Sequence, residues 1–257
     1  MNQLQPAITH DPVLVLNPEG QSNVILVCEH ASRFIPPEFE DLGLDELARQ
    51  SHIAWDPGAM GVAHALAMCL GAKLIAPNVS RLVYDCNRPP SARDAMPARS
   101  ETIDVPGNTN LTAPQRDDRT DKYYNPFRAS LAAIIAATPD PIIVTVHSFT
   151  PIYHGTQRTV EIGILHDSDA RLADAMMQAA SSHTNLKVAM NDPYGPKDGV
   201  THTLKEHAIT AGHLNVMIEI RNDLIADKSQ QDAMATCLAE WLTDALAALG
   251  APEGVQC

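Results

Sequence analysis

The sequence predicts an α/β protein with a mixed or mostly parallel sheet that is covered by helices on both faces. Short apolar runs alternate along the chain with amphipathic segments of helical period, the pattern of strand–helix units. The clearest run is Val24–Val27, where consecutive β-branched and leucine residues indicate a strand buried on both faces. Neither an internal repeat nor a linker divides the sequence, so we expect residues 1–257 to form a single domain.

The other elements are expected in chain order from the same signals. Pro57–Leu70 carries apolar residues at helical spacing, and Gly71 after it is a suitable C-terminal cap. Pro89–Asp118 shows no period and predicts a long loop, which in a compact domain is usually functional or disordered. Further strands are expected at Val13–Leu16, Lys73–Ala76, Leu82–Tyr84, Ile142–Val146, Thr159–Leu165, Lys187–Met190 and Val216–Ile218. Further helices are expected at Leu42–Arg49, Thr120–Ala137, from the N-cap Ser168 to Ser182, Leu204–Thr210 and Ala233–Leu249.

Composition excludes several classes of protein. A hydrophobic content of 45% excludes general disorder, and a formal net charge of −13 argues against nucleic acid as a partner. The N-terminus lacks the pattern of a signal peptide, and no apolar run approaches the roughly 20 residues that cross a bilayer. Five cysteines without a C-x-x-C pair are typical of free thiols in a reducing compartment. We expect a cytoplasmic protein with a small-molecule partner, and the sequence does not indicate its oligomeric state.

Two predicted strands run into histidines. His30 follows the Val24–Val27 strand after Cys28 and Glu29, and His147 follows Ile142–Val146. In open α/β sheets, ligands bind where the strands stop. The two histidines therefore indicate one shared metal site.

A third ligand is expected from a carboxylate. Asp56 directly precedes the Pro57–Leu70 helix, where it is either an N-cap or an oxygen ligand. Two imidazoles and a carboxylate would leave a fourth position open, as in catalytic zinc sites. Glu29 is the alternative, because it can reach the same ion as His30 if the strand has already ended. We favour Asp56 and keep Glu29 open.

A third apolar strand, Val216–Ile218, is followed by Glu219. Beside a metal-activated water, this carboxylate would serve as the general base of amide hydrolysis and then protonate the leaving nitrogen. Arg221 lies two residues further and is either a salt-bridge partner of Glu219 or a substrate ligand.

Other candidates would bind the substrate. In Asp85–Pro90, the guanidinium of Arg88 suits a carboxylate or a developing oxyanion, and Asn87 adds a neutral donor. Arg158 is a second candidate for gripping a substrate carboxylate. His202 and His207, near the loop before the last strand, are candidates for lining the site.

These motifs resemble those of the N-formylglutamate amidohydrolase family. Its signatures include a strand ending in His before a small-residue turn, an Asp-x-Asn-Arg-Pro-Pro motif, and a strand ending in His-Ser. The chain supplies them as Glu29–Ser32, Asp85–Pro90 and His147–Phe149. Gly199–Thr201 and Ile218–Ile220 fit the same pattern, so the likeness covers roughly residues 24 to 225. The family is more distantly similar to zinc carboxypeptidases and aspartoacylases, which also carry an Asp-x-Asn-Arg motif.

The resemblance implies a three-layer α/β/α fold with a mixed, mostly parallel sheet, similar to that of the zinc carboxypeptidases. It also implies a Zn²⁺-dependent amidohydrolase acting on a small N-acyl amino acid such as N-formylglutamate. The residues expected to carry this function are His30, Asp56 and His147 for the metal, Glu219 and Arg88 for catalysis, and Arg88, Asn87, Arg158 and Arg221 for the substrate. This chain has Cys28-Glu29 where histidine-pathway deformylases have Pro before the first His, and this departure leaves the substrate open.

Two alternatives remain at this point. One is a carboxypeptidase-like or other N-acyl amino acid deacylase. The other is a non-catalytic protein that binds a small acid on the same fold.

Overall fold

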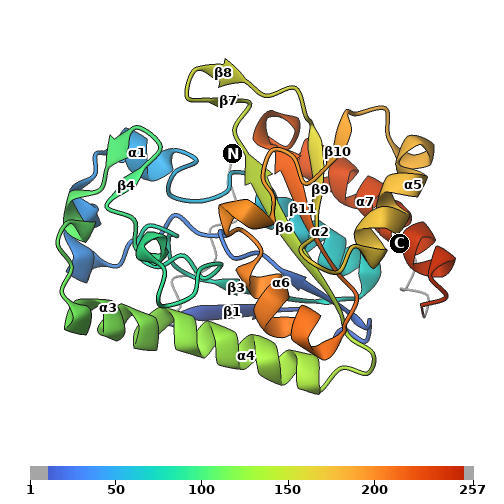
Figure 1. Cartoon of the computed structure of the whole chain (residues 1–257), viewed down its shortest axis with the longest axis horizontal. Coiled ribbons are helices and arrows are strands. Elements are labelled where there is room, and N and C mark those ends of the chain that lie inside the picture. The colour runs from blue at the N-terminus through green and yellow to red at the C-terminus, as the bar shows by residue number, and fades with distance from the viewer. Residues whose placement is uncertain (1–10, 252–257) are drawn as a thin grey trace.

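The computed structural model describes residues 11–251 and is built on a large mixed β-sheet (Figure 1). The strands of this sheet in the described residues are β1 (Val13–Leu16), β2 (Val24–Val27), β3 (Lys73–Pro77), β6 (Ile142–Phe149), β9 (Ile162–Leu165), β10 (Val188–Met190) and β11 (Asn215–Arg221). They lie in the order β1-β3-β2-β6-β11-β9-β10. β3, β2, β6 and β11 are mutually parallel, whereas β1 is antiparallel to β3, and β9 to β11. β10 runs parallel to β9. The expected mixed, mostly parallel sheet is confirmed.

Helices cover both faces of the sheet. They are α1 (Glu46–Gln50), α2 (Ala59–Leu70), α3 (Ala113–Arg119), α4 (Asn125–Ala136), α5 (Arg171–His183), α6 (His202–His207) and α7 (Lys228–Ala248). Val24 and Leu26 pack into a core with α2, α5 and α7, while Ile25 and Val27 pack into a second core with α4 and α6. Because successive side chains of a strand point to opposite faces, β2 is buried on both sides. The fold is the expected α/β class, with helix, sheet and helix layers.

Two small hairpins stand apart from the main sheet. β4 (Arg99–Ser100) pairs with β5 (Ile103–Asp104), and β7 (Ile152–Tyr153) pairs with β8 (Thr156–Gln157). Figure 1 shows β7 and β8 projecting beyond the sheet. The hairpin β4–β5 and helix α3 occupy parts of the Pro89–Asp118 segment that the sequence predicted as a loop, so that prediction was only partly correct.

Most expected elements are present with shifted ends. Gly71 caps α2 in a left-handed conformation at φ 60°, as expected. α7 begins at Lys228, five residues before the expected start, because Asp227 and Gln230 form a capping box there. The expected helix Leu42–Arg49 is replaced by a 3₁₀ segment, Pro37–Gly43, followed by the short α1.

Two local expectations were wrong. Leu82–Tyr84 is a turn rather than a strand, because the Ser80 hydroxyl accepts a hydrogen bond from Leu82 N and Ser80 O accepts one from Val83 N. These apolar side chains are fully buried in the α4 and α6 core without pairing in the sheet. Ser168 does not cap α5, which starts at Arg171 after Ala170.

The strands that carry candidate residues are longer than expected. β6 continues to Phe149 and β11 to Arg221, so His147 and Glu219 lie inside strands rather than after them. β2 ends at Val27, which leaves Glu29 and His30 in a turn. None of the helices in residues 11–251 is long and apolar enough to span a membrane. That residues 1–257 form one domain stays a prediction, and its ends, 1–10 and 252–257, lie outside the described residues.

Candidate active site

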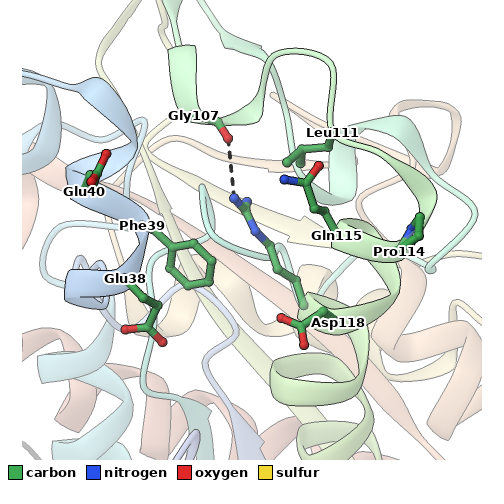
Figure 2. Close-up of a pocket in the computed structure, with 9 residues that line it drawn as sticks. Glu38, Phe39, Glu40, Gly107, Leu111, Pro114, Gln115 and Asp118 are labelled. Carbon is green, nitrogen blue, oxygen red and sulfur yellow. Dashed lines mark hydrogen bonds between the residues drawn. The ribbon is translucent and has the colours of Figure 1, made fainter.

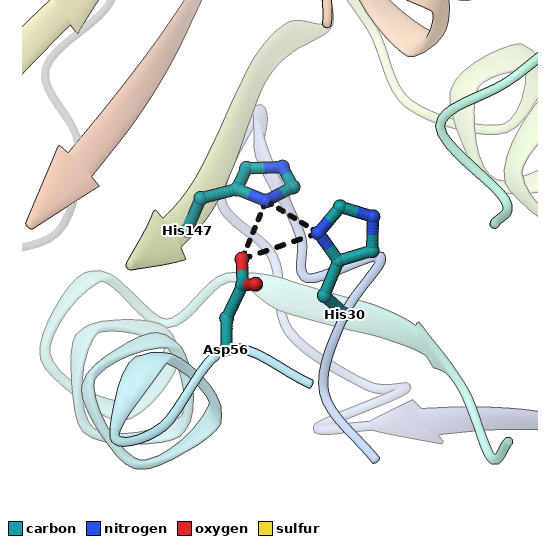
Figure 3. A group of neighbouring side chains, drawn as sticks. All are labelled: His30, Asp56 and His147. Atoms are coloured by element: carbon teal, nitrogen blue, oxygen red, sulfur yellow. Dashed lines mark hydrogen bonds and ion pairs between the residues drawn. The ribbon is translucent and has the colours of Figure 1, made fainter. Parts of the chain in front are cut away.

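Three side chains from distant parts of the chain meet at one edge of the sheet (Figure 3). His30 follows β2, Asp56 precedes α2, and His147 lies in β6. The Nδ1 atoms of His30 and His147 are 3.2 Å apart, and Asp56 Oδ2 lies 3.2 Å from the first and 2.9 Å from the second. All three residues are buried. We call this group the three-residue cluster.

The donor atoms of the three-residue cluster fit a metal ion. Two imidazole nitrogens and a carboxylate oxygen this close need either shared protons or one cation between them. Ligands of a tetrahedral zinc ion are separated by about 3.3 Å, which is close to the observed distances. The three-residue cluster can therefore hold a metal, with a position left for water or substrate.

The outer nitrogens of both histidines face carboxylates. His30 Nε2 lies 2.8 Å from Asp85 Oδ1, and His147 Nε2 forms an ion pair with Glu29 Oε2 at 3.0 Å. Such carboxylate partners orient metal-binding histidines and raise their basicity. The structure thus places Asp56 among the three converging atoms and Glu29 behind His147, at the far side of the imidazole ring.

Arg81 connects the carboxylates on both sides of His30. Its Nη1 lies 3.3 Å from Asp56 Oδ1, and its Nη2 lies 2.9 Å from Asp85 Oδ2. The sequence interpretation missed this residue and the role of Asp85. The available signal was that Arg81 lies four residues before Asp85, the first residue of the Asp-x-Asn-Arg-Pro-Pro motif.

The charges in this network reinforce one another. Burial alone would raise the pKa of Asp56, but His30 and His147 hold it well below its ordinary value. Burial would lower the pKa of His147, but Glu29 and Asp56 raise it well above its ordinary value. Burial would likewise raise the pKa of Asp85, which His30 and Arg81 hold far below its ordinary value. The carboxylates are therefore ionised and available to ligate or to orient the histidines.

Glu219 lies next to the three-residue cluster. It is opposite His147 in the pairing of β11 with β6 and is 5% exposed. Its Oε2 atom is buried and has no hydrogen-bond partner among the described residues. Burial raises the pKa of Glu219 to about 7. A buried carboxyl with a free oxygen beside the three-residue cluster is suited to exchanging a proton near neutral pH.

Comparisons with known proteins identify the family of this chain. The family model of N-formylglutamate amidohydrolase matches residues 22–226, which include every residue described above. The chain belongs to the N-formylglutamate amidohydrolase family. A solved gene product of Agrobacterium tumefaciens is 51% identical, with a TM-score of 0.91, over 93% of this chain and 96% of that one. N-formylglutamate amidohydrolase from Ralstonia eutropha shares the fold, with 19% identity and a TM-score of 0.55 over 93% and 97% of the two chains. None of the curated proteins matches the sequence significantly.

In this member of the family, a glycine makes room for Glu219. Gly163 in β9 lies opposite Glu219 in the antiparallel pairing with β11. A Cβ atom at Gly163 would lie 2.4 Å from Asp192 O and 3.3 Å from Glu219 Cβ. Because real Cβ atoms do not approach a backbone oxygen that closely, glycine is required here.

The Asp-x-Asn-Arg-Pro-Pro motif at Asp85–Pro90 clamps a distant loop. Asn87 is 1% exposed; its Nδ2 donates to Val200 O, and its Oδ1 accepts from Thr203 N at 3.0 Å. Arg88 donates from Nη1 to Gly199 O at 2.8 Å and from Nε to Asp94 Oδ2 at 2.7 Å. The structure therefore gives Asn87 a bracing role, and leaves only the Nη2 group of Arg88 without a partner among the described residues.

A pocket of about 500 Å³ contains Arg88 and Arg158. The guanidinium of Arg158 lies over the rings of Tyr153 at 4.4 Å, Tyr194 at 4.7 Å and Phe149 at 5.4 Å. In the described residues no carboxylate pairs with Arg158. Phe149 follows His147 by two residues in β6, which connects the pocket with the three-residue cluster.

Tyr194 is a pocket residue that the sequence interpretation missed. Burial raises its pKa to about 12, and the nearby carboxylate of Glu219 adds to the rise. The phenol therefore stays protonated and remains a hydrogen-bond donor in the pocket lining.

A second hollow, of about 450 Å³, lies beside Phe39 and Asp118 (Figure 2). Arg119 crosses it, over the Phe39 ring at 4.5 Å, and donates to Val83 O at 3.3 Å and Asn108 Oδ1 at 2.7 Å. The bond to Val83 holds the turn that leads to Asp85. Arg119 thus supports the site through the backbone.

Three further candidates lie outside the pocket lining. Arg221 pairs with Asp223 at 2.8 Å and Glu161 at 3.3 Å rather than with Glu219. His202 Nε2 lies 2.7 Å from the hydroxyl of Tyr124. His207 is at the end of α6, where burial lowers its pKa to about 4.

Proposed function

We propose that this protein is a zinc-dependent amidohydrolase that cleaves the amide of a small N-acyl amino acid such as N-formylglutamate. Family membership supports hydrolysis of an amide bond. The observation that carries the proposal is the convergence of His30, Asp56 and His147 beside the free Oε2 atom of Glu219.

His30, Asp56 and His147 would hold the ion. When bound, zinc supplies Lewis-acid polarisation of the acyl carbonyl and lowers the pKa of water. Glu29 and Asp85 keep the histidine rings oriented from behind.

Glu219 moves the proton in the proposed reaction. Its Oε2 accepts a proton from the attacking water and then delivers that proton to the nitrogen of the departing amine. The buried position of Glu219 favours this role, because a carboxyl with a raised pKa can both take up and release a proton near neutral pH.

Two arginines would bind the substrate. Arg88 lines the pocket, and its Nη2 group, which has no partner among the described residues, would polarise or anchor the substrate. Arg158 lacks a carboxylate partner in the described residues, and its aromatic surroundings leave an anion of the substrate as its counter-ion. Arg221 already has two carboxylate partners, so we leave it out of the substrate site.

The test combines metal analysis with a substrate screen. Purified protein should contain close to one zinc per chain and should release amine from an N-formyl amino acid faster than from N-acetyl and N-succinyl analogues. Release of amine only from peptides would favour a carboxypeptidase-like enzyme. Zinc with no turnover of any N-acyl amino acid or peptide would favour the non-catalytic binding protein.

We also infer a reducing compartment such as the cytoplasm. The four described cysteines, Cys28, Cys69, Cys86 and Cys237, are unpaired thiols, which fits such a compartment. Cys257 lies outside the described residues.

A further inference from the structure

The hairpin β7–β8 forms one wall of the pocket. Tyr153 and Thr156 lie in its two strands, Arg158 directly follows β8, and all three line the pocket. The hairpin leaves the main sheet at Phe149, the last residue of β6. Its orientation therefore decides where the guanidinium of Arg158 lies relative to His147.

The tip of this hairpin has an unusual backbone. His154 and Gly155 connect the strands with φ values of 48° and 76°. Two-residue hairpin turns with both φ values positive favour Asn and Gly, and a histidine at the first position is less favourable. A contact from outside the hairpin holds this conformation: His154 N donates to Glu101 Oε1 at 3.1 Å.

Glu101 connects the hairpin with two other segments. It lies in the turn between β4 and β5, where its own φ is 52°. Its Oε2 atom lies 2.8 Å from His52 Nε2, beyond the end of α1. The Glu101 side chain is 16% exposed, so it is largely enclosed by the parts that it connects.

We propose that Glu101 is a positioning residue that holds the β7–β8 hairpin in place. This hairpin is the wall of the pocket that recognises the substrate's side chain. The claim about substrate rests on the proposed function. Glu101 is not in the pocket lining and acts through the backbone of His154 and through His52. Arg158, held by this wall, selects N-acyl amino acids whose side chain ends in a carboxylate.

Hydrogen exchange tests the positioning without any substrate. In the zinc-loaded protein, Glu101→Ala should increase the exchange rate of the His154 amide by about tenfold or more, because its acceptor is lost. Glu101→Gln keeps an acceptor oxygen and should restore most of the protection. Unchanged protection of the hairpin in Glu101→Ala would overturn the proposal.

Steady-state kinetics test whether the hairpin wall recognises the substrate's side chain. Glu101→Ala should raise KM for N-formylglutamate about tenfold while kcat changes less than about twofold, because binding is weakened and the reacting groups stay in place. KM for N-formylglycine, which has no side chain for the hairpin to recognise, should stay the same. Equal effects on both substrates, or a fall in kcat alone, would refute the assigned role.

A matched variant separates this role from general damage to the β4–β5 turn. Asp104 lies in the same hairpin and pairs with Arg99 at 2.8 Å, and its polar contacts within the described residues do not reach β7–β8. Asp104→Ala should leave both the His154 amide and KM as in the parent, and a result like that of Glu101→Ala would contradict the proposal. If the parent enzyme turns over neither substrate, both the proposed function and the recognition of the substrate's side chain are wrong. Hydrogen exchange alone then decides whether Glu101 holds the hairpin.

Discussion

Glu219 lies directly opposite His147 in the parallel pairing of β11 with β6. Side chains of paired residues point to the same face of a sheet, and neighbouring strands are about 4.8 Å apart. The proposed general base and a proposed metal ligand are therefore positioned by the central sheet, with completely buried residues such as Val146 and Ile218 next to them. A site built on core strands is held more rigidly than one built on loops.

Glu219→Gln should abolish most of the turnover. The amide has nearly the same shape but cannot accept a proton, so kcat should fall by about 10²–10⁴-fold at unchanged zinc content. Rates of amine release and metal analysis on the same sample measure both quantities.

Glu161→Gln is the control for that variant, because Glu161 lies outside the three-residue cluster and pairs with Arg221. It should keep near-parental kcat. If Glu219→Gln loses zinc instead of turnover, Glu219 belongs among the metal ligands.

His30→Ala and His147→Ala should each lower zinc occupancy sharply. Each removes one of three converging ligand atoms from the proposed centre. Metal analysis after dialysis gives the occupancy, and circular dichroism checks that the fold is kept. Full zinc retention in His147→Ala would rule out this assignment, and His183→Ala, whose ring pairs with the exposed Asp244 outside the three-residue cluster, serves as the histidine control.

Glu29→Gln and Asp85→Asn should weaken metal binding without abolishing it. Both carboxylates face the outer nitrogen of a histidine whose other nitrogen points into the three-residue cluster. Loss of such a partner typically costs about 10–100-fold in metal affinity or activity. Competition with a chromogenic chelator measures the affinity, and parental affinity in both variants would show that these contacts do not tune the ligands.

Gly163→Ala should disturb the position of Glu219. The new methyl group would meet Asp192 O at 2.4 Å, so the backbone of one of the strands or of the loop has to move. We expect a loss of about 1–3 kcal/mol in the free energy of unfolding, as for other overpacked sites, together with reduced kcat. Urea unfolding measures the first effect. Gly155→Ala is not a suitable control because of its positive φ, whereas Gly195→Ala, whose nearest neighbour would be at 3.4 Å, should have a small effect.

Acid should destabilise the protein partly through His207. Burial lowers the pKa of His207 from 6.5 to about 4. Between these two pH values His207 binds a proton in the unfolded chain but not in the folded protein. This stability is fully present above pH 6.5 and is lost as the pH falls towards 4. Allowing for the partial exposure of the ring, we expect about 1 kcal/mol between pH 7 and pH 5.

Metal-free protein is the right sample for this measurement, because zinc binding is itself dependent on pH. Urea unfolding of the parent and of His207→Gln at both pH values gives the difference. An equal pH dependence of the two proteins would contradict the assignment.

The sequence predicted the fold class and the residues that meet at the three-residue cluster because both depend on short, strong signals. The apolar strand β2 and the mostly apolar first part of β6 are recognisable from composition alone, and His30 and His147 follow shortly after those runs. Asp56 was separable from Glu29 only in three dimensions, because the choice depends on which side of the His147 ring each carboxylate lies.

Other features could not be read from the sequence for physical reasons. Leu82–Tyr84 has the composition of a strand, but hydrogen bonds to the hydroxyl and the carbonyl of Ser80 turn the backbone there. Arg81 and Tyr194 become part of the site through contacts with residues that are distant in the chain, such as Asp56 and Arg158. No local pattern encodes such contacts.

The clamp made by Asn87 and Arg88 binds only backbone atoms of the distant loop, namely Gly199 O, Val200 O and Thr203 N. Backbone atoms are the same whatever side chain a residue carries. The loop can therefore exchange the side chain of Val200 on the pocket wall while its course past the site stays fixed. A substitution there can therefore change the pocket wall without moving the strands that carry His147 and Glu219.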